Sequence, residues 1–375
     1  MAQVALELQP CCGNRSGIGI YAYELAKRLI NDEKLNFSGN LFNFLGKNDV
    51  KELFLNIKFP IYTQECLPYG LYRRIWNFIP VNYSTMFPKA DLNIFFNYIV
   101  PPKISGKVIN TICDVTYLRF PESMNEKNLS RITKNIDYSI ERSDSIITIS
   151  EFSKNEISEL LKVSKEKISV IYCAPSFSEY KVDFVKIKNK YKISSPYLLY
   201  VGTIEPRKNI VRLVKSFELL KKNFNLPHKL VLAGSVGWKT ENIIKTINKS
   251  SFRDDIILTG YISEEEKNTL YTNSEIFVFP SLYEGFGIPP LEAMHFGCPV
   301  VCSNVASLPE IVGEAAELVN PFDEITIAEG IIKVLNNKNY RSKLIESGYI
   351  QEQKFSWDES ALRLKLLCDE VLEND

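Results

Sequence analysis

Two adjacent cations, Arg207 and Lys208, follow the apolar run YLLYV within the segment GTIEPRKN. The run predicts a strand, so both cations stand at its carboxyl end, ahead of a predicted helix whose dipole disfavours positive charge there. A planar guanidinium fork beside a mobile amine suits a diphosphate. We therefore expect Arg207 and Lys208, with Gly202 in the same segment, to bind a diphosphate. A solvated surface pair is the alternative.

Two carboxylates, Glu284 and Glu292, stand farther along the chain in the string YEGFGIPPLEA. Pro289 and Pro290 suit the first positions of a helix, where a missing N–H costs nothing, and this places Glu292 in the first turn. Carboxylates accept hydrogen bonds from hydroxyl groups, in which sugars and ribose are rich. We expect both carboxylates to point into a ligand cleft. The alternative for Glu292 alone is that it complements the helix dipole.

A glycine-containing loop, GNRSGIG at residues 13–19, separates the first predicted strand from the first predicted helix. Gly17 and Gly19 would let the backbone approach a phosphate at the helix N-terminus. The spacing is not that of the dinucleotide fingerprint, because Tyr21 and Ala22 stand where its third glycine belongs. A tight strand-to-helix turn explains the loop equally well.

The elements that must position these residues are short apolar runs that alternate with helix-length amphipathic segments. The strand candidates are VALEL, VINTIC, SIITIS, ISVIY, YLLYVG, KLVLAG, DIILTG, EIFVFP and PVVCSN. Continuous apolar runs predict strands buried on both faces, and their alternation with helices predicts parallel sheets. We expect an α/β protein with two doubly wound Rossmann-like domains that face each other across a cleft. The ligand would lie at the carboxyl ends of the strands.

We expect two domains of similar size, over 1–175 and 196–355. The stretch between them, 176–195, is rich in lysine, is bracketed by prolines and shows no clear period, which predicts a linker. An amphipathic helix with Ser356 as its N-cap is expected over 356–375.

The composition is that of a globular protein, with 45% hydrophobic and 24% charged residues among 375. Forty-five basic residues balance 45 acidic ones, which argues against a nucleic-acid partner. Eight cysteines without regular spacing predict reduced thiols, and the start of the chain has neither a signal peptide nor a membrane-length apolar run. We expect a cytoplasmic protein.

Charge is distributed unevenly along the chain, with a net charge of +5 over 1–190 and −5 over 191–375. Chance is one explanation. The other is that the first half faces an anionic partner, such as a phospholipid surface or a lipid pyrophosphate, which predicts peripheral contact with the inner face of the cytoplasmic membrane.

Three further features carry weaker signals. The only histidines are His228 and His295, which makes a histidine-based metal site or catalytic triad improbable. Cys298 and Cys302 flank a predicted strand and read as small core residues. Aromatic and basic residues mix over residues 69–78, where a core-facing helix explains them better than a membrane wedge does.

Together these segments resemble glycosyltransferase family 4, the retaining nucleoside-diphosphate-sugar transferases of GT-B fold. The resemblance is carried by YVGTIEPRKNI, by the two glutamates with seven residues between them, by SLPEIVGEAAELVNPFD and by the terminal FSW. TICDVTYLRFPE and SIITISEFSKNEI are similar to segments of that family's acceptor domain. The resemblance covers nearly the whole chain.

The resemblance implies a role for each candidate residue. Arg207 and Lys208 would hold the diphosphate and neutralise the leaving group, and Glu292 would bind the ribose hydroxyls. Glu284 would bind hydroxyls of the transferred sugar, together with the backbone around three neighbours: Phe286, Gly287 and Ile288. The loop at Gly17 would approach the phosphates from the acceptor domain.

One position departs from the family pattern, which often has His-Asp where this chain has Cys113-Asp114. The histidine usually lies beside the transferred sugar, so its replacement bears on donor identity. Asp114 is expected to contact donor or acceptor.

The resemblance further implies that 1–175 is the acceptor-binding domain, that 196–355 is the nucleotide-sugar-binding domain and that the final helix crosses back to the first domain. It also implies front-face substitution through an oxocarbenium-like transition state. Fixed cations and a helix N-terminus would make a divalent metal unnecessary, so we expect neither a metal nor a cofactor. The expected reaction moves a hexose or deoxyhexose, of mannose or rhamnose type, to a lipid-linked oligosaccharide in O-antigen- or capsule-type synthesis. Two alternatives stay open. One is a nucleotide-sugar epimerase of the same architecture, and the other is a non-catalytic homologue that supports a partner transferase.

Overall fold

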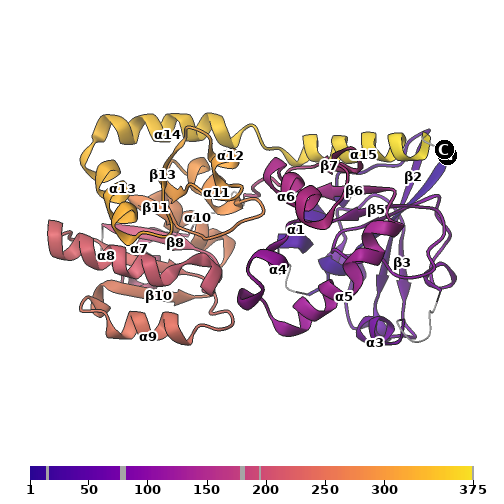
Figure 1. The fold of residues 1–375 in the computed structure, drawn as a ribbon, viewed down its shortest axis with the longest axis horizontal. Helices are drawn as coiled ribbons and strands as arrows, with labels where there is room; N and C mark the ends of the chain where they lie inside the picture. The colour runs from indigo at the N-terminus through magenta and orange to yellow at the C-terminus, as the bar shows by residue number, and fades with distance from the viewer. Residues whose placement is uncertain (14–16, 77–81, 178–181, 194–195, 374–375) are drawn as a thin grey trace. The chain divides into compact units, whose positions relative to one another are not determined.

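The computed structural model describes residues 1–13, 17–76, 82–177, 182–193 and 196–373. The chain forms two compact units. The first comprises Met1–Tyr117, Glu126–Cys173 and Ser356–Asp375, and the second comprises Leu118–Asn125 and Ala174–Phe355. Each unit has its own parallel sheet with helices packed on it (Figure 1). The predicted α/β class is confirmed.

The first unit holds a seven-stranded parallel sheet in the order β3-β2-β1-β4-β5-β6-β7. Its strands are β1 (Ala2–Glu7), β2 (Leu35–Phe42), β3 (Ile61–Gln64), β4 (Leu92–Phe95), β5 (Lys107–Thr111), β6 (Ser145–Thr148) and β7 (Ile168–Val170). The order runs outward in both directions from the neighbours β1 and β4, which makes the sheet doubly wound.

Three of these strands, β2, β3 and β4, have no counterpart among the predicted runs. Strand β2 has the sequence LNFSGNLF. Its polar residues and glycine interrupt the apolar run that would predict a buried strand. The glycine has a packing reason: a Cβ on Gly39 would lie 2.5 Å from Cδ1 of Leu8 and 2.6 Å from Cδ1 of Ile61. Strands β3 (IYTQ) and β4 (LNIF) contain polar residues, so neither forms a continuous apolar run.

The second unit holds a six-stranded parallel sheet in the order β10-β9-β8-β11-β12-β13. Its strands are β8 (Tyr197–Val201), β9 (Lys229–Ala233), β10 (Ile256–Gly260), β11 (Ile276–Phe279), β12 (Val300–Ser303) and β13 (Ala316–Val319). All but β13 match predicted runs. The sheet reverses its order between β8 and β11, so this unit is also doubly wound, and the Rossmann-like character of both units is confirmed.

Helices connect the strands and cover the sheets. Those of the first unit are α1 (Gly17–Ala26), α2 (Val50–Leu53), α3 (Tyr69–Ile75), α5 (Glu126–Arg142), α6 (Glu151–Leu161) and α15 (Trp357–Glu373). Those of the second unit are α7 (Phe184–Tyr191), α8 (Ile210–Phe224), α9 (Glu241–Lys249), α10 (Glu264–Asn273), α11 (Ile288–His295), α12 (Leu308–Val312), α13 (Glu324–Asn336) and α14 (Lys338–Glu352). Among the described residues, no helix combines the length and the apolar composition that crossing a bilayer requires.

The unit boundaries differ from the expected domain limits at two places. The stretch 176–195 contains helix α7, which belongs to the second unit: Ile187 is buried, and the Tyr191 hydroxyl donates to Glu266 Oε2 at 2.9 Å. Residues Leu118–Asn125 also belong to the second unit, beginning within the short helix α4 (Thr116–Arg119). Within that unit the indole of Trp238 donates to the Ser123 carbonyl. Two lysines of this stretch, Lys186 and Lys190, lie on the exposed face of α7.

The final helix, α15, belongs to the first unit although its sequence follows the second. The Ser360 hydroxyl donates to the Tyr172 carbonyl at 2.8 Å, and the ring of Trp357 packs edge-on against Tyr21. The helix begins at Trp357, and Oγ of Ser356 accepts a hydrogen bond from the backbone N–H of Asp358 at 3.2 Å, as expected of an N-cap.

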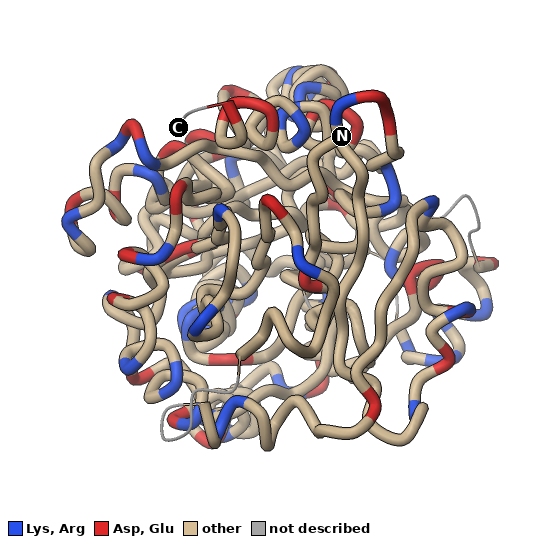
Figure 2. The backbone as a smooth tube through the Cα atoms, turned by 90° about the vertical axis from the view of Figure 1, so that its right-hand side faces the viewer, with Lys and Arg blue, Asp and Glu red and all other residues tan. Residues whose placement is uncertain are grey.

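The uneven charge of the two halves does not produce an extended basic face in the view of Figure 2, where Lys and Arg are interspersed with Asp and Glu along the backbone.

Candidate active site

The carboxyl ends of β8 and β11 meet at the point where the strand order of the second sheet reverses. In doubly wound sheets the chain leaves the two strands in opposite directions at this point, which opens a crevice for ligands. After β8 the chain forms a 3₁₀ turn, η6 (Pro206–Lys208), and after β11 it forms the loop that contains Glu284. The topology thus brings two predicted site segments to one sheet edge.

Arg207 and Lys208 both form ion pairs with Glu284. Nη1 of Arg207 donates to Oε2 of Glu284 at 2.9 Å, and Nζ of Lys208 donates to Oε1 at 2.5 Å. Nη2 of Arg207 donates to Oε1 of Glu205 at 2.9 Å, and its Nη1 also donates to the Tyr283 carbonyl at 2.6 Å. Two cations therefore face two carboxylates. The expected compensation of Arg207 and Lys208 by negative charge is present within the protein itself.

This cluster is largely buried, which sets its electrostatics. Burial by itself would raise the pKa of Glu284, but Arg207 and Lys208 outweigh it and lower the pKa to about 2. Burial lowers the pKa of Lys208, the charge of Arg207 lowers it further, and Glu284 opposes both. The Glu284 carboxylate is thus ionised across the physiological range, and the amine of Lys208 is held beside it.

The loop after Glu284 is fixed in shape by Ser307. Its hydroxyl lies 2.8 Å from the carbonyl of Glu284 and 2.6 Å from that of Phe286. Gly287 has φ 113°, and a Cβ there would lie 2.6 Å from Cδ2 of Leu308, so no other residue fits without a shift. Helix α11 then begins at Ile288, as the two prolines predict.

Glu292 lies in the second turn of α11, not in the first as predicted, because the helix begins four residues earlier at Ile288. Both of its carboxylate oxygens are bonded to helix α10. Oε1 accepts from Nζ of Lys267 at 2.7 Å, and Oε2 accepts from the hydroxyl of Tyr271 at 3.0 Å. The N-terminus of α10 is stabilised by a capping box between Ser263 and Glu266.

Gly202 and Gly234 directly follow β8 and β9, and neither position has room for a side chain. The φ of Gly202 is 149°, and a Cβ there would lie 2.8 Å from the hydroxyl oxygen of Tyr200. Gly234, at the end of β9, has φ 143°, and a Cβ there would lie 2.1 Å from the carbonyl oxygen of Gly202. Side chains are thus excluded from this edge of the sheet, beside the segment that carries Arg207.

The remaining candidates lie in the first unit. Helix α1 begins at Gly17, and residues 14–16 of the predicted loop lie outside the described residues. A Cβ on Gly17 would meet no atom within 4 Å, and Gly19 is buried with its carbonyl accepting from Sγ of Cys11 at 3.6 Å. No neighbouring atom therefore requires a glycine at position 17. The role predicted for Gly17, which is to let the backbone approach a phosphate, stays a prediction.

Asp114 is anchored in the first unit by two hydrogen bonds to Oδ1, from the backbone N–H of Thr116 at 2.9 Å and from the hydroxyl of Tyr98 at 3.2 Å. Its neighbour Cys113 is buried, and burial followed by the charge of Asp114 raises the pKa of the thiol. The thiol is therefore protonated and behaves as a small apolar group.

The structure brings Arg207, Lys208 and Glu284 into one cluster. Phe286 and Gly287 lie on the adjoining loop, and Ile288 is the first residue of α11. Glu292 belongs to a separate hydrogen-bonded group with Lys267 and Tyr271. The sequence analysis missed four partners that hold these residues: Glu205, Lys267, Tyr271 and Ser307. Only Glu205 offered a signal, since it lies in the segment GTIEPRKN itself.

The histidines take structural contacts. His228 Nε2 lies 3.3 Å from Oε2 of Glu275, and the ring of His295 stacks on Phe177 with centroids 3.5 Å apart. Cys298 and Cys302 are buried, as expected of core residues. Over the described ranges, no three side chains of His, Cys, Asp or Glu are grouped so that they could hold a metal ion.

Two Rossmann-like units, with a cluster of two cations and two carboxylates at the second unit's switch point, define the class of protein as a GT-B glycosyltransferase. Residues 183–351 match the family described as glycosyl transferases group 1. The chain is 33% identical over 267 residues to O-antigen chain mannosyltransferase B of Escherichia coli, and the match covers 70% of each chain. The chain belongs to the glycosyltransferase group 1 family, and the resemblance on which the sequence analysis rested is confirmed.

Two further curated relatives have similar names. The chain is 32% identical over 228 residues to the serotype-specific mannosyltransferase WbdA of Escherichia coli, which covers 59% of this chain and 28% of WbdA. It is 30% identical over 214 residues to the O-antigen chain mannosyltransferase RfbU of Salmonella typhimurium, covering 57% of each. The chain thus spans about a quarter of WbdA and just over half of RfbU.

Solved structures show the same fold over the whole chain. Sucrose-phosphate synthase from Thermosynechococcus elongatus superposes with a TM-score of 0.77 at 20% identity, covering 100% of both chains. HepE of Anabaena, in complex with UDP-glucose, has a TM-score of 0.73 at 15% identity, covering 99% of this chain and 100% of that one. WaaG, a glycosyltransferase involved in lipopolysaccharide biosynthesis, has a TM-score of 0.71 at 15% identity, with the same coverage.

Proposed function

We propose that this glycosyltransferase moves a mannose-type hexose or deoxyhexose from a nucleoside diphosphate sugar to a lipid-linked oligosaccharide, with retention of configuration, in O-antigen- or capsule-type synthesis. The observation that carries the proposal is the buried cluster of Arg207, Lys208 and Glu284 at the switch point of the second sheet. The relatives named as O-antigen mannosyltransferases support the sugar and the pathway class.

The ion pairs of the cluster explain how a donor would enter. A diphosphate carries more charge than one carboxylate, so it would replace Glu284 as the partner of Lys208 and of one Arg207 nitrogen. The contact from Arg207 to the Tyr283 carbonyl would keep the guanidinium in place during the exchange. Glu284 would then accept hydrogen bonds from hydroxyls of the transferred sugar, which is the role the resemblance implies.

Glu292 would bind the ribose hydroxyls from a position that Lys267 and Tyr271 fix. Each of its oxygens already accepts one hydrogen bond, and a carboxylate oxygen can accept a second. Lys267 also pairs with Glu264 at 2.8 Å, so the amine that neutralises Glu292 is itself anchored. A fixed carboxylate gives ribose recognition without the cost of ordering a mobile side chain.

The chemical step that fits these residues is front-face substitution. The bond from the anomeric carbon to the diphosphate oxygen breaks, and the electron pair leaves with the diphosphate. The acceptor hydroxyl forms the new bond on the same face and gives its proton to a departing phosphate oxygen. Arg207 and Lys208 would stabilise the charge that develops on the diphosphate, so catalysis is positioning and electrostatic stabilisation. We propose that these cations serve in place of a metal and that no cofactor takes part.

In the first unit, Asp114 and the loop at Gly17 and Gly19 are proposed to face the donor or the acceptor. An acceptor anchored by a lipid would bring the enzyme to a membrane surface. We therefore propose a cytoplasmic enzyme with peripheral contact to anionic lipid, and no nucleic-acid partner.

The test is an assay of the purified chain with labelled nucleotide sugars, with and without lipid-linked oligosaccharide from an O-antigen-producing strain. If the chain transfers sugar, labelled product appears in the lipid phase and one nucleoside diphosphate is released per sugar transferred. An epimerase would instead convert the donor without an acceptor. A non-catalytic homologue would bind donor, seen as a rise in Tm with one nucleoside diphosphate, but release nothing.

A further inference from the structure

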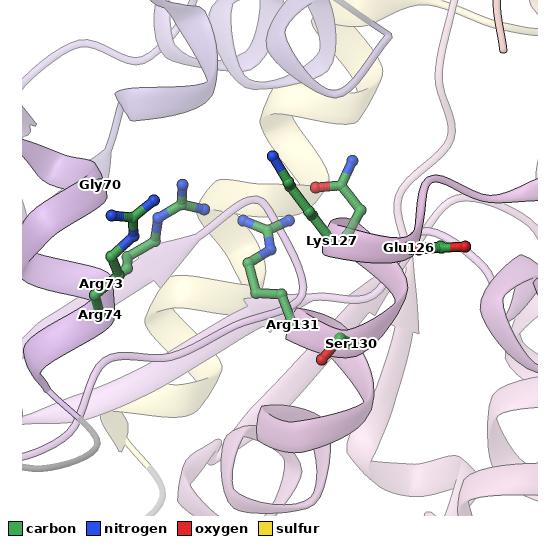
Figure 3. A pocket seen from close by; sticks show the side chains of 8 residues that line it. Gly70, Arg73, Arg74, Glu126, Lys127, Ser130 and Arg131 are labelled. Atoms are coloured by element: carbon green, nitrogen blue, oxygen red, sulfur yellow. The ribbon is translucent and has the colours of Figure 1, made fainter.

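A cavity of about 700 Å³ in the first unit lies between helices α3 and α5. The residues that line it include Arg73 and Arg74 from α3, and Lys127 and Arg131 from α5. Figure 3 shows the guanidinium groups of Arg73 and Arg74 directed toward the same space as the amine of Lys127 and the guanidinium of Arg131. The single lining carboxylate, Glu126, points away from them.

The two inner arginines are incompletely satisfied by the protein. Nε of Arg73 and Nε of Arg131 are buried, and neither forms a hydrogen bond to any described residue. The Arg73 guanidinium lies 4.5 Å from the centroid of the Tyr69 ring, a contact that orients the group without neutralising it. Buried N–H groups without partners are costly, and a ligand with acceptor oxygens would satisfy both of them.

The nearby carboxylate does not balance this charge. Glu7, at the end of β1, is buried, and its Oε1 has no hydrogen-bond partner among the described residues. Burial raises the pKa of Glu7 to about 8, although Arg73 and Arg131 oppose the shift. Near neutral pH the cluster therefore keeps an excess of positive charge. The Arg207 cluster differs, because two carboxylates neutralise it.

The position in the fold also suits a ligand site. Glu7 ends the strand β1, which pairs with β4 where the order of the first sheet reverses. The carboxyl edge of a doubly wound sheet at this point is where ligands bind. Arg73 and Arg131 act electrostatically on Glu7, so the cluster lies at this edge.

We propose that this cavity is a second anion site, which binds the phosphate or diphosphate group of a ligand other than the sugar donor. Guanidinium forks pair with phosphate oxygens through two parallel hydrogen bonds, and the amine of Lys127 adds a mobile charge. This inference rests on the proposed function in one respect, the source of the ligand. If the proposed function holds, the ligand is the diphosphate that joins the acceptor sugar to its lipid. A free phosphate compound is the other source of the same chemistry.

The experiment titrates the full chain with two probes, inorganic pyrophosphate and farnesyl diphosphate, and measures heat and stoichiometry. The donor cluster is first occupied by a nucleoside diphosphate found in the Tm screen. Arg73→Gln/Arg131→Gln removes the inner groups. Arg74→Gln/Lys127→Gln changes two exposed residues and should therefore fold normally. It tests the proposal even if the first double variant does not fold. Arg363→Gln, an exposed arginine of α15 outside the cavity, is the matched control.

The proposal predicts that both double variants bind pyrophosphate at least tenfold more weakly than the wild type, while the control binds normally. Tighter binding of farnesyl diphosphate than of pyrophosphate assigns a lipid-linked source, and equal binding assigns a free phosphate. Unchanged binding in Arg74→Gln/Lys127→Gln overturns the proposal. These outcomes do not depend on sugar transfer, so the proposed function is tested separately.

Discussion

Lys208 and Glu284, 76 residues apart in the sequence, place Nζ and Oε1 2.5 Å from each other at the carboxyl edge of the second sheet. The same carboxylate also binds Arg207, so one side chain holds both cations that are expected to meet the donor. The pairing keeps two buried cations positioned and solvated by the protein before a substrate arrives. A change at Lys208 therefore affects stability as well as catalysis.

The first prediction concerns Lys208→Met. Methionine keeps an apolar stem beside the Phe279 ring, whose centroid lies 5.1 Å from Nζ, and leaves the pair of Arg207 and Glu284 intact. We expect kcat to fall by about 10²–10³-fold, because one charge that stabilises the leaving diphosphate is lost. The free energy of unfolding should fall by only about 1–3 kcal/mol.

The control for this change is Lys333→Met, which removes an exposed lysine of the same unit that is paired with Glu317 at 2.7 Å. It should keep a normal kcat. If Lys208→Met transfers sugar at the wild-type rate, Lys208 does not belong to the diphosphate clamp. Rates come from release of the nucleoside diphosphate, and stability from thermal unfolding.

The second prediction concerns stability in acid. The pKa of Glu284 is about 2 in the folded chain against an ordinary value of 4.5, so the folded state binds fewer protons than the unfolded state between these values. Its contribution is complete above about pH 4.5 and is lost as the pH falls toward 2. The loss amounts to roughly 3 kcal/mol.

The measurement is the free energy of unfolding from pH 6 to 2 for the wild type and Glu284→Gln. The variant should be less stable at pH 6 and should show a shallower decline. Glu359→Gln, which removes an exposed carboxylate paired with Arg363, serves as a control with the wild-type slope. Parallel curves for the wild type and Glu284→Gln would mean that the ion pairs do not stabilise the folded state.

The third prediction concerns Glu7, whose pKa is raised to about 8 chiefly by burial. The folded state keeps a proton that the unfolded state has lost, so stability should fall as the pH rises from about 4.5 to about 8. Glu7→Gln cannot ionise and should remove this decline. Relative to the wild type, the variant should therefore gain stability between pH 5 and 8, as followed by urea unfolding; a constant difference would contradict the raised pKa.

The fourth prediction is that transfer survives EDTA. Arg207 and Lys208 supply positive charge at the expected position of the diphosphate, which is the part a divalent ion would otherwise play. Initial rates with and without EDTA should agree. Activity that disappears with EDTA and returns with Mn²⁺ or Mg²⁺ would refute this prediction.

The fifth prediction concerns Cys113 and the donor sugar. In the family that the chain resembles, a histidine at this position lies near the sugar's C6 hydroxyl, whereas the buried thiol is a poor hydrogen-bonding group. We expect a 6-deoxyhexose donor to be used at least as well as its 6-hydroxy counterpart. An apolar pocket discriminates by about 1–3 kcal/mol, which limits the preference to about 10–200-fold.

The measurement is kcat/KM for GDP-mannose and GDP-rhamnose, or another matched pair, in the wild type and Cys113→His. The variant should shift the ratio toward the 6-hydroxy sugar. A wild type that strongly prefers the 6-hydroxy sugar, with no shift in the variant, would show that the thiol does not set donor choice.

The sequence could predict much of the fold because its central strands are continuously apolar. Tyr197–Val201 is buried along its whole length and stands out from the polar segments around it. Strand β2 could not be predicted in this way, since its Gly39 is explained only by contacts with Leu8 and Ile61, which depend on the tertiary structure. An apolar run in the sequence indicates that a strand is buried on both faces. It does not indicate where a neighbouring side chain leaves room only for a glycine.

The site could be predicted in part for a similar reason. Arg207, Lys208 and Glu284 were identifiable because adjacent cations and a carboxylate follow strands that end at one sheet edge. Their pairing with one another could not be predicted, because residues of opposite charge that are so far apart in the sequence form no local pattern. The anchoring of Glu292 by α10 likewise depends on packing of helices that are separate in the sequence.

Because α15 belongs to the first unit, residues 357–373 complete a structure whose sheet is built from strands between residues 2 and 170. A ribosome that has made the first unit's sheet has not yet made Trp357, which packs on Tyr21, or Ser360, which binds the Tyr172 carbonyl. The first unit therefore reaches its final packing only after α15 has been synthesised. A premature stop after α14 would spare the second unit and leave the amino-terminal one unfinished.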